Sequence, residues 1–312
     1  GYELLQSGIP WSGGHASSPD STTKISTCRP IVLSSGRPLA YFSGGMSNRI
    51  DATFEKLRSN REKAFVAYVS AGDPDLERSL QIMIALAEAG ADILELGVPF
   101  SDPLADGVVN QAAAARALSA GSNSSRIFEL IRRFRQAHEV PIVLFTYLNP
   151  VYTYGYSIFH EDAAQAGADG ILLLDLPPDE AAQNCEMAHS AGLKQIRLIA
   201  PTTPPDRVEL LAGMAEGFIY ALSRTGVTGS HGGPSAQIGD HVAAIKQFTD
   251  VPVCVGFGIS TPEQAALVSS VADGIVVGSA IVKQVEIHCD APDVADKVRA
   301  FAEPLIAAVK ES

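Results

Sequence analysis

The chain has 312 residues, of which 46% are hydrophobic and 19% are charged, a composition typical of a globular protein. Its formal net charge of −12 gives no electrostatic reason to expect a nucleic-acid partner. No apolar run approaches the ~18 to 20 residues that a membrane helix requires, and no two cysteines are at CxxC spacing. We therefore expect a reduced, cytoplasmic protein without a cysteine-based metal site.

Residues 1–45 differ from the rest because they are rich in Ser, Gly and Pro and show no sustained hydrophobic period. We expect a disordered extension or an expression-derived tail. A plastid transit peptide, and with it a plastid location, is the alternative, because the segment is poor in acids and rich in Ser and Thr. A secretory signal is not supported, since no long apolar core follows a basic start.

Residues 46–312 are expected to form one domain that opens with a helix. In SNRIDATFEKLRSN, the apolar residues Ile50, Phe54 and Leu57 recur at helical spacing. This stretch therefore predicts an amphipathic N-terminal helix.

Eight short apolar runs follow, and after each come turn residues and a longer amphipathic segment. The runs are FVAYV (65–69), DILEL (92–96), IVLFTY (142–147), GILLLDL (170–176), QIRLIA (195–200), FIYAL (218–222), VCVGF (253–257) and GIVVG (274–278). Most are continuously apolar, as expected of parallel strands covered on both faces. Eight strand–helix units predict an α/β fold, a single-domain (β/α)8 TIM barrel with the added N-terminal helix. An open doubly wound sheet would show GxGxxG after the first strand, where SAGDPD stands instead.

Several residues mark the expected helix boundaries. Gly90 and Gly167 fit C-terminal caps, where a left-handed conformation suits glycine. Asp73-Pro74 and Thr261-Pro262 each pair an N-cap residue with proline at the first helical position, and Gln264 completes a capping-box spacing with Thr261.

The loops after the seventh and eighth strands have the composition of a phosphate site. GFGIS (256–260) contains Gly258, and Gly278 and Ser279 open a short helical stretch. Glycines allow close backbone approach to an anion, and N–H groups at a helix start favour negative charge. These two loops are also the usual phosphate location in this fold, although the glycines could instead serve only tight turns. The glycine-rich loop 223–235 could be a mobile lid, with Gly229 as a third backbone contact.

Acidic residues gather at the end of the second strand. Glu95 ends the apolar run, and Asp102 and Asp106 follow in a loop broken by prolines and a glycine. A carboxylate in the apolar wall of a barrel mouth should have a raised pKa and could exchange protons near neutral pH. For Asp106, capping of a helix that begins near Gly107 is the alternative.

Two tyrosines could reach the same cavity, Tyr147 on the third strand and Tyr220 on the sixth, or could be ordinary core aromatics. The sixth strand has no lysine, which disfavours a Schiff-base aldolase, and no His/Asp/Glu set clusters at the strand ends to bind a metal. We therefore expect carboxylate acid/base chemistry on a phosphorylated substrate, with no cofactor and no metal.

Five motifs occur in an order that resembles one family: LELGVPFSDPLADG, LLLDLPPDE, YALSRTGVTG, GFGIS and GSAIV. SAGDPD and YLNPVYTYG agree with the same pattern. Together they resemble the α subunit of tryptophan synthase, from Met46 to about Ser312. The resemblance implies retro-aldol cleavage of indole-3-glycerol phosphate to indole and glyceraldehyde 3-phosphate.

The resemblance also implies roles for individual residues. In the family, the glutamate at the position of Glu95 is the general acid/base. The aspartate at the position of Asp106 binds the indole N–H and stabilises the developing positive charge. The remaining positions that resemble substrate-binding residues are Tyr220, Thr228, Gly229, Phe257, Gly258, Gly278 and Ser279, with Tyr147 as an added cavity candidate. One departure is Val108, where the family pattern leads us to expect proline after LADG.

The family subunit joins a pyridoxal-phosphate β subunit, which implies an α2β2 heterotetramer with that cofactor only in the partner. Asp102 resembles a contact residue for the partner. Three alternatives stay open: a stand-alone indole-3-glycerol-phosphate lyase, a mainly non-catalytic activator of a β partner, and a sugar-phosphate isomerase barrel. The presence of both Glu95 and Asp106 disfavours the last two.

Overall fold

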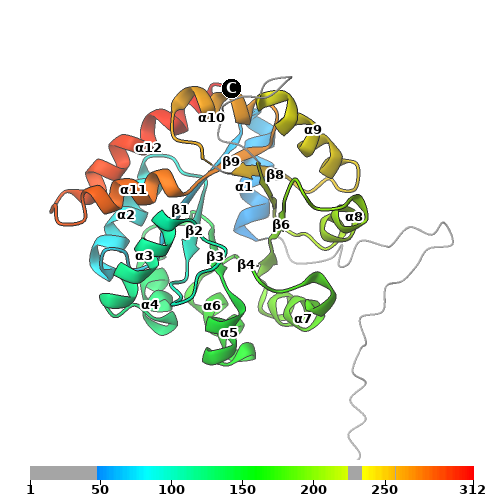
Figure 1. Cartoon of the computed structure of the whole chain (residues 1–312). Helices are drawn as coiled ribbons and strands as arrows, with labels where there is room; N and C mark the ends of the chain where they lie inside the picture. The colour runs from blue at the N-terminus through cyan, green and yellow to red at the C-terminus, as the bar shows by residue number, and fades with distance from the viewer. Residues whose placement is uncertain (1–47, 224–233, 257) are drawn as a thin grey trace, which may run out of the picture.

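The computed structural model describes residues 48–223, 234–256 and 258–312, and these form a barrel of parallel strands inside a ring of helices (Figure 1). The expected (β/α)8 fold is confirmed. The prediction for residues 1–45 lies outside the described residues and stays a prediction. The strands are β1 Ala64–Ser70, β2 Ile93–Gly97, β3 Ile142–Thr146, β4 Gly170–Leu173, β5 Lys194–Gln195, β6 Arg197–Ile199, β7 Ile219–Leu222, β8 Val253–Gly256 and β9 Gly274–Val277.

The nine strands correspond to the eight predicted ones because the fifth is interrupted. Their order is β5-β4-β3-β2-β1-β9-β8-β7-β6. β5 pairs with β4 and β6 pairs with β7, and only Ile196 separates these two short strands. The Ile196 N–H donates to the carbonyl oxygen of Ile171 in β4 at 3.0 Å. The run QIRLIA thus bridges the two ends of the strand order and closes the barrel.

The helices surround the strands. They are α1 Arg49–Asn60, α2 Leu76–Glu88, α3 Val108–Ser119, α4 Ser124–Phe134, α5 Leu148–Tyr154, α6 Tyr156–Ala166, η1 Pro178–Glu180, α7 Ala182–Ala191, α8 Pro205–Gly213, α9 Pro234–Lys246, α10 Pro262–Ser269, α11 Ser279–Ile287 and α12 Val294–Lys310. No helix in the described ranges is long and apolar enough to cross a membrane.

Alternating strand residues build two cores. In β1, Phe65 and Ala67 belong to the cluster that includes the outer helices, whereas Ala64 and Val66 belong to a second cluster inside the barrel. This period of two is the ordinary geometry of a strand with both faces covered. The predicted N-terminal helix, α1, buries its three apolar residues in the inner cluster: Ile50, Phe54 and Leu57. It therefore closes one end of the barrel and leaves the other end for the site.

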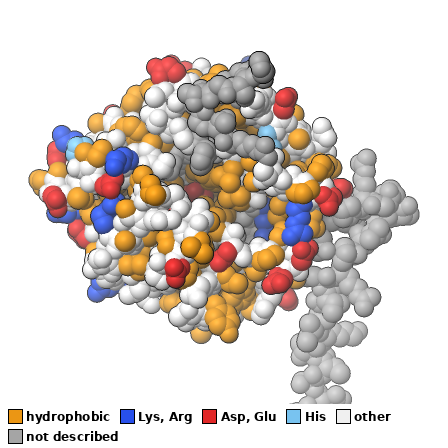
Figure 2. All heavy atoms as spheres, in the orientation of Figure 1, with side chains coloured by type: hydrophobic (Ala, Val, Ile, Leu, Met, Phe, Trp, Pro, Cys, Tyr) orange, Lys and Arg blue, Asp and Glu red, His pale blue; other side chains and the backbone are white. Residues whose placement is uncertain are grey.

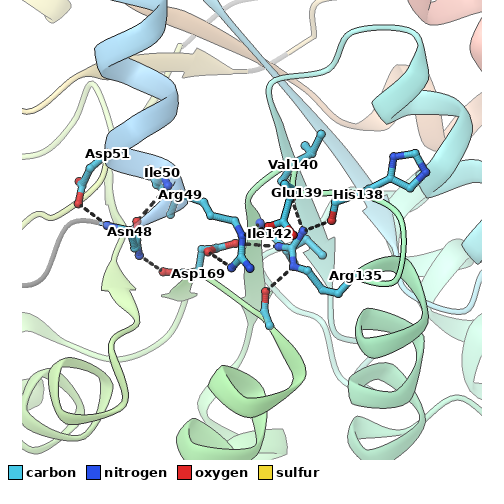
Figure 3. A network of polar contacts seen from close by, with 11 residues as sticks. Asn48, Arg49, Ile50, Asp51, Arg135, His138, Glu139, Val140, Ile142 and Asp169 are labelled. Atoms are coloured by element: carbon cyan, nitrogen blue, oxygen red, sulfur yellow. Dashed lines mark hydrogen bonds and ion pairs between the residues drawn. The ribbon is translucent and has the colours of Figure 1, made fainter.

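A polar network fixes the start of α1 to the barrel (Figure 3). Asp169, which precedes β4, accepts hydrogen bonds from the side chains of Arg49 at 3.0 Å and Arg135 at 2.8 Å, and from the Ile142 N–H at 2.9 Å. The Asn48 amide group donates to the carbonyl oxygen of Asp169 at 2.8 Å. One carboxylate thus joins α1, the C-cap of α4 and β3.

Most of the predicted helix boundaries agree with the structure, and one is wrong. Gly167 caps α6 with φ 104, Gly90 follows α2 with φ 102, and Thr261 caps α10. The pair Asp73-Pro74 does not begin a helix. Asp75 is the N-cap of α2, and Asp73 instead makes two hydrogen bonds of 2.8 Å to Arg116. The two charge-assisted hydrogen bonds to Arg116 stabilise the buried Asp73 carboxylate more than one bond to a helix N–H group would.

Candidate active site

Glu95 points into the barrel near its open end. It lies in β2 beside Tyr68 of β1 and Val143 of β3, in phase with the inward-facing Ile93. Only 1% of its surface is exposed, and Oε1 has no hydrogen-bond partner among the described residues. Burial first, and then the charge of Asp106, raises the pKa of Glu95 to about 8. The carboxyl group is therefore mostly protonated at neutral pH and can exchange its proton there.

Asp106 lies in the loop between β2 and α3 and is half-buried. Its Oδ2 accepts a hydrogen bond of 3.0 Å from the Tyr147 hydroxyl group. The N-cap of α3 is Gly107, with no side-chain capping bond, so the structure does not use Asp106 as a helix cap. Burial raises the pKa of Asp106, while hydrogen bonds from Tyr147 and Asn110 lower it.

Tyr147 follows β3 and holds the loop that carries Asp106. Its hydroxyl oxygen accepts from the Ala105 N–H at 3.0 Å while the hydroxyl donates to Asp106. Its ring packs on Phe100 with centroids 5.4 Å apart. Burial, followed by the charge of Asp106, raises the pKa of Tyr147, so the phenol keeps its proton. Tyr147 is thus a buried aromatic residue with a polar task at the site.

Tyr220 lies in β7 against the inner core, and glycine makes room for it. A Cβ atom at Gly256 would come within 2.5 Å of the Tyr220 hydroxyl oxygen. Burial, and then the charge of Glu95, raises the pKa of Tyr220. Tyr68 of β1 has a similar position, because a Cβ atom at Gly97 would overlap its hydroxyl group.

Tyr68 and Asn110 are two further candidates for the site that were not predicted from the sequence. Both line one pocket with Asp106 and Tyr147. The inward phase of Ala64 and Val66 extends to residue 68, so the strand alternation contains the signal for Tyr68. Asn110 lies in the first turn of α3, four positions after Asp106 in the sequence, and its buried Oδ1 has no partner within the described ranges. Figure 2 shows a hollow near the centre of this face of the molecule, with hydrophobic side chains around it.

Gly258 and α11 form the predicted phosphate end. Gly278 is the N-cap of α11 without a side-chain capping bond, and Ser279 is exposed as the first helical residue. The first hydrogen bond of the helix runs from the Val282 N–H to the Gly278 carbonyl oxygen, at 3.1 Å. The N–H groups of the preceding turn therefore have no acceptor within the helix. Gly258 is exposed with φ 72, a conformation that favours glycine.

The start of α11 adjoins the pocket that contains Asp106. A Cβ atom at Gly278 would lie 3.5 Å from the Cβ atom of Tyr68, which lines the pocket with Asp106. Three predicted site residues lie outside the described residues: Thr228, Gly229 and Phe257. The structure does describe Gly258, Gly278, Ser279, Tyr220, Tyr147, Glu95 and Asp106.

Asp102 does not line the pocket that contains Asp106. It is exposed in the loop between β2 and α3, where its carbonyl oxygen accepts from the Leu104 N–H at 2.9 Å. Leu104 is 88% exposed, and Val108 at the start of α3 is 80% exposed. Within the described part of the chain, no group of three or more His, Cys, Asp or Glu residues is placed to hold a metal ion.

Comparison with known proteins identifies one family. Residues 54–310 match the family described as "Tryptophan synthase alpha chain". The tryptophan synthase alpha chain of Desulfatibacillum aliphaticivorans is 48% identical over 261 residues, which cover 84% of this chain and 98% of that protein. The Geobacter sulfurreducens tryptophan synthase alpha chain is 48% identical over 262 residues, which cover 84% of this chain and 99% of that protein.

Solved structures agree. Tryptophan synthase subunit alpha from Legionella pneumophila has a TM-score of 0.79 and 38% identity, and the match covers 85% of this chain and 100% of that chain. The aminoacrylate-bound form of tryptophan synthase from M. tuberculosis has a TM-score of 0.76 and 33% identity, and the match covers 84% of this chain and 100% of that chain.

Proposed function

The chain belongs to the tryptophan synthase alpha chain family, and we propose that it cleaves indole-3-glycerol phosphate with Glu95 as its general acid/base. The family assignment makes the protein a carbon–carbon lyase of tryptophan biosynthesis that releases indole and glyceraldehyde 3-phosphate. One observation supports this role. The carboxyl group of Glu95 is buried at the open end of the barrel, has one oxygen without a hydrogen-bond partner among the described residues, and has a pKa of about 8.

The protonation state of Glu95 suits the reaction. The protonated carboxyl group donates to indole C3 and produces a cationic indolenine. The resulting carboxylate takes the proton from the glycerol hydroxyl group beside the breaking bond. The carbon–carbon bond then breaks, its electrons restore the indole ring, and the hydroxyl carbon becomes the aldehyde. Glu95 ends with its proton, so the cycle is balanced without a cofactor in this chain.

Asp106 supplies the negative charge for the indole end. Its carboxylate lies on the same pocket as Tyr68 and Asn110, and Tyr147 fixes the direction of one oxygen. We assign this carboxylate as the acceptor for the indole N–H. A fixed acceptor close to a developing cation lowers the energy of the transition state.

The start of α11 and Gly258 are the proposed phosphate contacts. Backbone N–H groups and the helix dipole favour the phosphate dianion there. The closeness of Gly278 to Tyr68 supports this placement, because the substrate has an indole at one end and a phosphate at the other.

A β subunit is the proposed partner, and the exposed loop between β2 and α3 is the proposed contact. Leu104 and Val108 present apolar surface next to the acidic Asp102. Exposed apolar side chains in the loop that carries Asp106 are suited to an interface that also influences the site. Pyridoxal phosphate would then belong to the partner, in an α2β2 assembly.

An indole-release assay tests the function. Indole-3-glycerol phosphate is supplied to the chain with and without a tryptophan synthase β subunit. We expect weak release alone, strong release with the partner, and none from Glu95→Gln in either case. Strong release alone would indicate a stand-alone lyase. Partner activation that persists while neither wild type nor variant releases indole would indicate a non-catalytic activator.

A further inference from the structure

The outer face of the fifth strand carries two polar residues, whereas the outward residues of the other strands are mostly apolar. Gln195 in β5 and Arg197 in β6 are 3% and 6% exposed, and they face the helical ring beside α7. In β1, the corresponding outward residues include Phe65 and Ala67. A buried guanidinium group needs a counter-charge or a full set of acceptors, because removal from water is costly.

Arg197 has no carboxylate partner among the described residues. No ion pair joins it to an Asp or Glu in these ranges, and its buried Nε has no hydrogen-bond acceptor there. Its Nη2 instead donates to Cys185 Sγ of α7 at 2.9 Å. An adjacent guanidinium group favours the thiolate form of cysteine over the thiol, and the thiolate is the counter-charge that Arg197 otherwise lacks.

Tyr156 does not supply the counter-charge that Arg197 lacks. Burial raises the pKa of Tyr156 to about 12, with a further contribution from Cys185, so this phenol remains neutral. Asn184 donates to Gln195 Oε1 at 2.7 Å, and its own Oδ1 contacts His160 Nε2 at 2.7 Å, so these three side chains form a separate hydrogen-bond network. The buried Gln195 Nε2 has no acceptor in the described part of the chain. Unpaired donors therefore stand on Gln195 and Arg197, on the side of the strand that faces Cys185.

We propose that Cys185 is an oxidation-sensitive thiolate, activated by Arg197 and open to small hydroperoxides. The sulfur attacks the terminal peroxide oxygen, an S–O bond forms, and the O–O bond breaks. Sulfur loses two electrons, the peroxide is reduced to its alcohol or to water, and the cysteine becomes a sulfenate. The new oxygen carries the charge, and the guanidinium group of Arg197 is placed to pair with it.

Two properties of Cys185 allow this chemistry. Its side chain is partly exposed on α7, in the outer helical ring (Figure 1), whereas Cys254 is buried inside the barrel. The site is also apart from Glu95 and Asp106, which lie at the barrel mouth. The inference is therefore independent of the proposed lyase activity.

The pH dependence of alkylation tests the thiolate. The full chain carrying Cys28→Ser and Cys289→Ser is treated with iodoacetamide, and labelling of Cys185 is followed by mass spectrometry. We expect the half-maximal rate at least about one pH unit lower in the folded chain than in concentrated urea, because arginine lowers cysteine pKa values to this extent or more. Arg197→Met should remove the difference, and Arg197→Lys should keep most of it.

Arg207→Met is the matched control, because Arg207 lies on the neighbouring helix α8 and pairs with Asp179 at 2.8 Å. It should leave the alkylation profile unchanged. In a second assay, hydrogen peroxide with dimedone should trap the sulfenic acid at Cys185 in the parent chain and at least tenfold more slowly in Arg197→Met. Equal profiles in folded and urea-treated parent chain, or no dimedone adduct on the folded parent, overturn the proposal. The comparison with urea stands even if Arg197→Met does not fold.

Discussion

Glu95, the proposed general acid/base, lowers the stability of the folded chain at high pH. Its pKa is raised to about 8 in the folded chain, from an ordinary value of 4.5. Between these pH values the folded chain binds the Glu95 proton and the unfolded chain releases it. The free energy of unfolding therefore falls as pH rises through this window, by up to about 1.4 kcal/mol for each pH unit.

Glu95→Gln should consequently stabilise the protein at high pH while it abolishes cleavage. Glutamine does not titrate, so the variant keeps the stability that wild type loses between about pH 4.5 and 8. We expect nearly equal free energies of unfolding at pH 4.5 and an advantage for the variant at pH 8.5, on the order of 2 to 4 kcal/mol after allowance for local relaxation. Urea denaturation of wild type and variant at both pH values measures this difference in the free energy of unfolding. Equal stability at pH 8.5 would show that Glu95 is ionised in the folded chain at little cost.

Tyr147→Phe tests how Asp106 is held. The change removes the hydroxyl group that donates to Asp106 and accepts from the Ala105 N–H. A hydrogen bond to a charged group contributes about 1.5 to 3 kcal/mol, so kcat/KM for indole release should fall about 10- to 100-fold. Loss of the donor also raises the pKa of Asp106, which should move the acid limb of the pH–rate profile upward.

The control for this change is Tyr154→Phe, which removes a hydroxyl group bonded to Asp162 at 2.6 Å away from the pocket. It should leave kcat/KM within about twofold. If both variants lose activity equally, the Asp106 contact has no special role.

At the scale of elements, much of the architecture could be predicted from sequence. Continuous apolar runs such as IVLFTY gave the strands, because a parallel strand covered on both faces has no polar side. The interruption at Ile196 could not be predicted, since it depends on pairing with two different neighbours. The interpretation of Asp73 failed because the local Asp-Pro signal does not reveal Arg116, 43 positions away in the sequence.

At the site, too, some residues could be predicted from the sequence and others could not. Glu95 stood out because a carboxylate interrupts an apolar strand, and the acids of the following loop were visible beside it. Tyr68 did not stand out, since an aromatic residue is as ordinary in a strand as valine. Its relevance arises only when Gly97 of the neighbouring strand leaves space for its hydroxyl group.

Asp169→Asn tests the element contact that secures α1. Burial raises the pKa of Asp169 despite its two arginines, so the ion pair itself is not a large source of stability. Removing the charge is nevertheless costly, because Arg135 stays buried with 9% of its side chain exposed. We expect the free energy of unfolding to fall by about 3 kcal/mol in urea denaturation.

Glu139→Gln is the control, since Glu139 also pairs with Arg49 but has 77% of its side chain exposed. Water and salt screen an exposed pair of this kind, so it contributes little and the variant should remain close to wild type. A comparable loss in both variants would mean that the burial of Arg135 does not decide the cost.

For the whole molecule, the position of the proposed interface matters because the same loop carries Asp102, Leu104 and Asp106. A partner that covers Leu104 would restrict the loop and hold Asp106 toward Tyr147, which gives association a direct route to the active site. Leu104→Asp places a charge on this surface without disturbing the core, because the side chain is 88% exposed.

Leu104→Asp should weaken association with the β subunit by 10-fold or more in Kd, a loss of at least about 1.4 kcal/mol, while the thermal midpoint of the isolated chain stays within about 2 °C. Titration calorimetry measures the association, and indole release measures its consequence. Activity with saturating β subunit should recover toward wild type, because the variant alters affinity and leaves Glu95 in place. Ile287→Asp provides the comparison, since Ile287 is 57% exposed at the far end of α11. If Ile287→Asp weakens the complex and Leu104→Asp does not, the partner binds another face of the barrel.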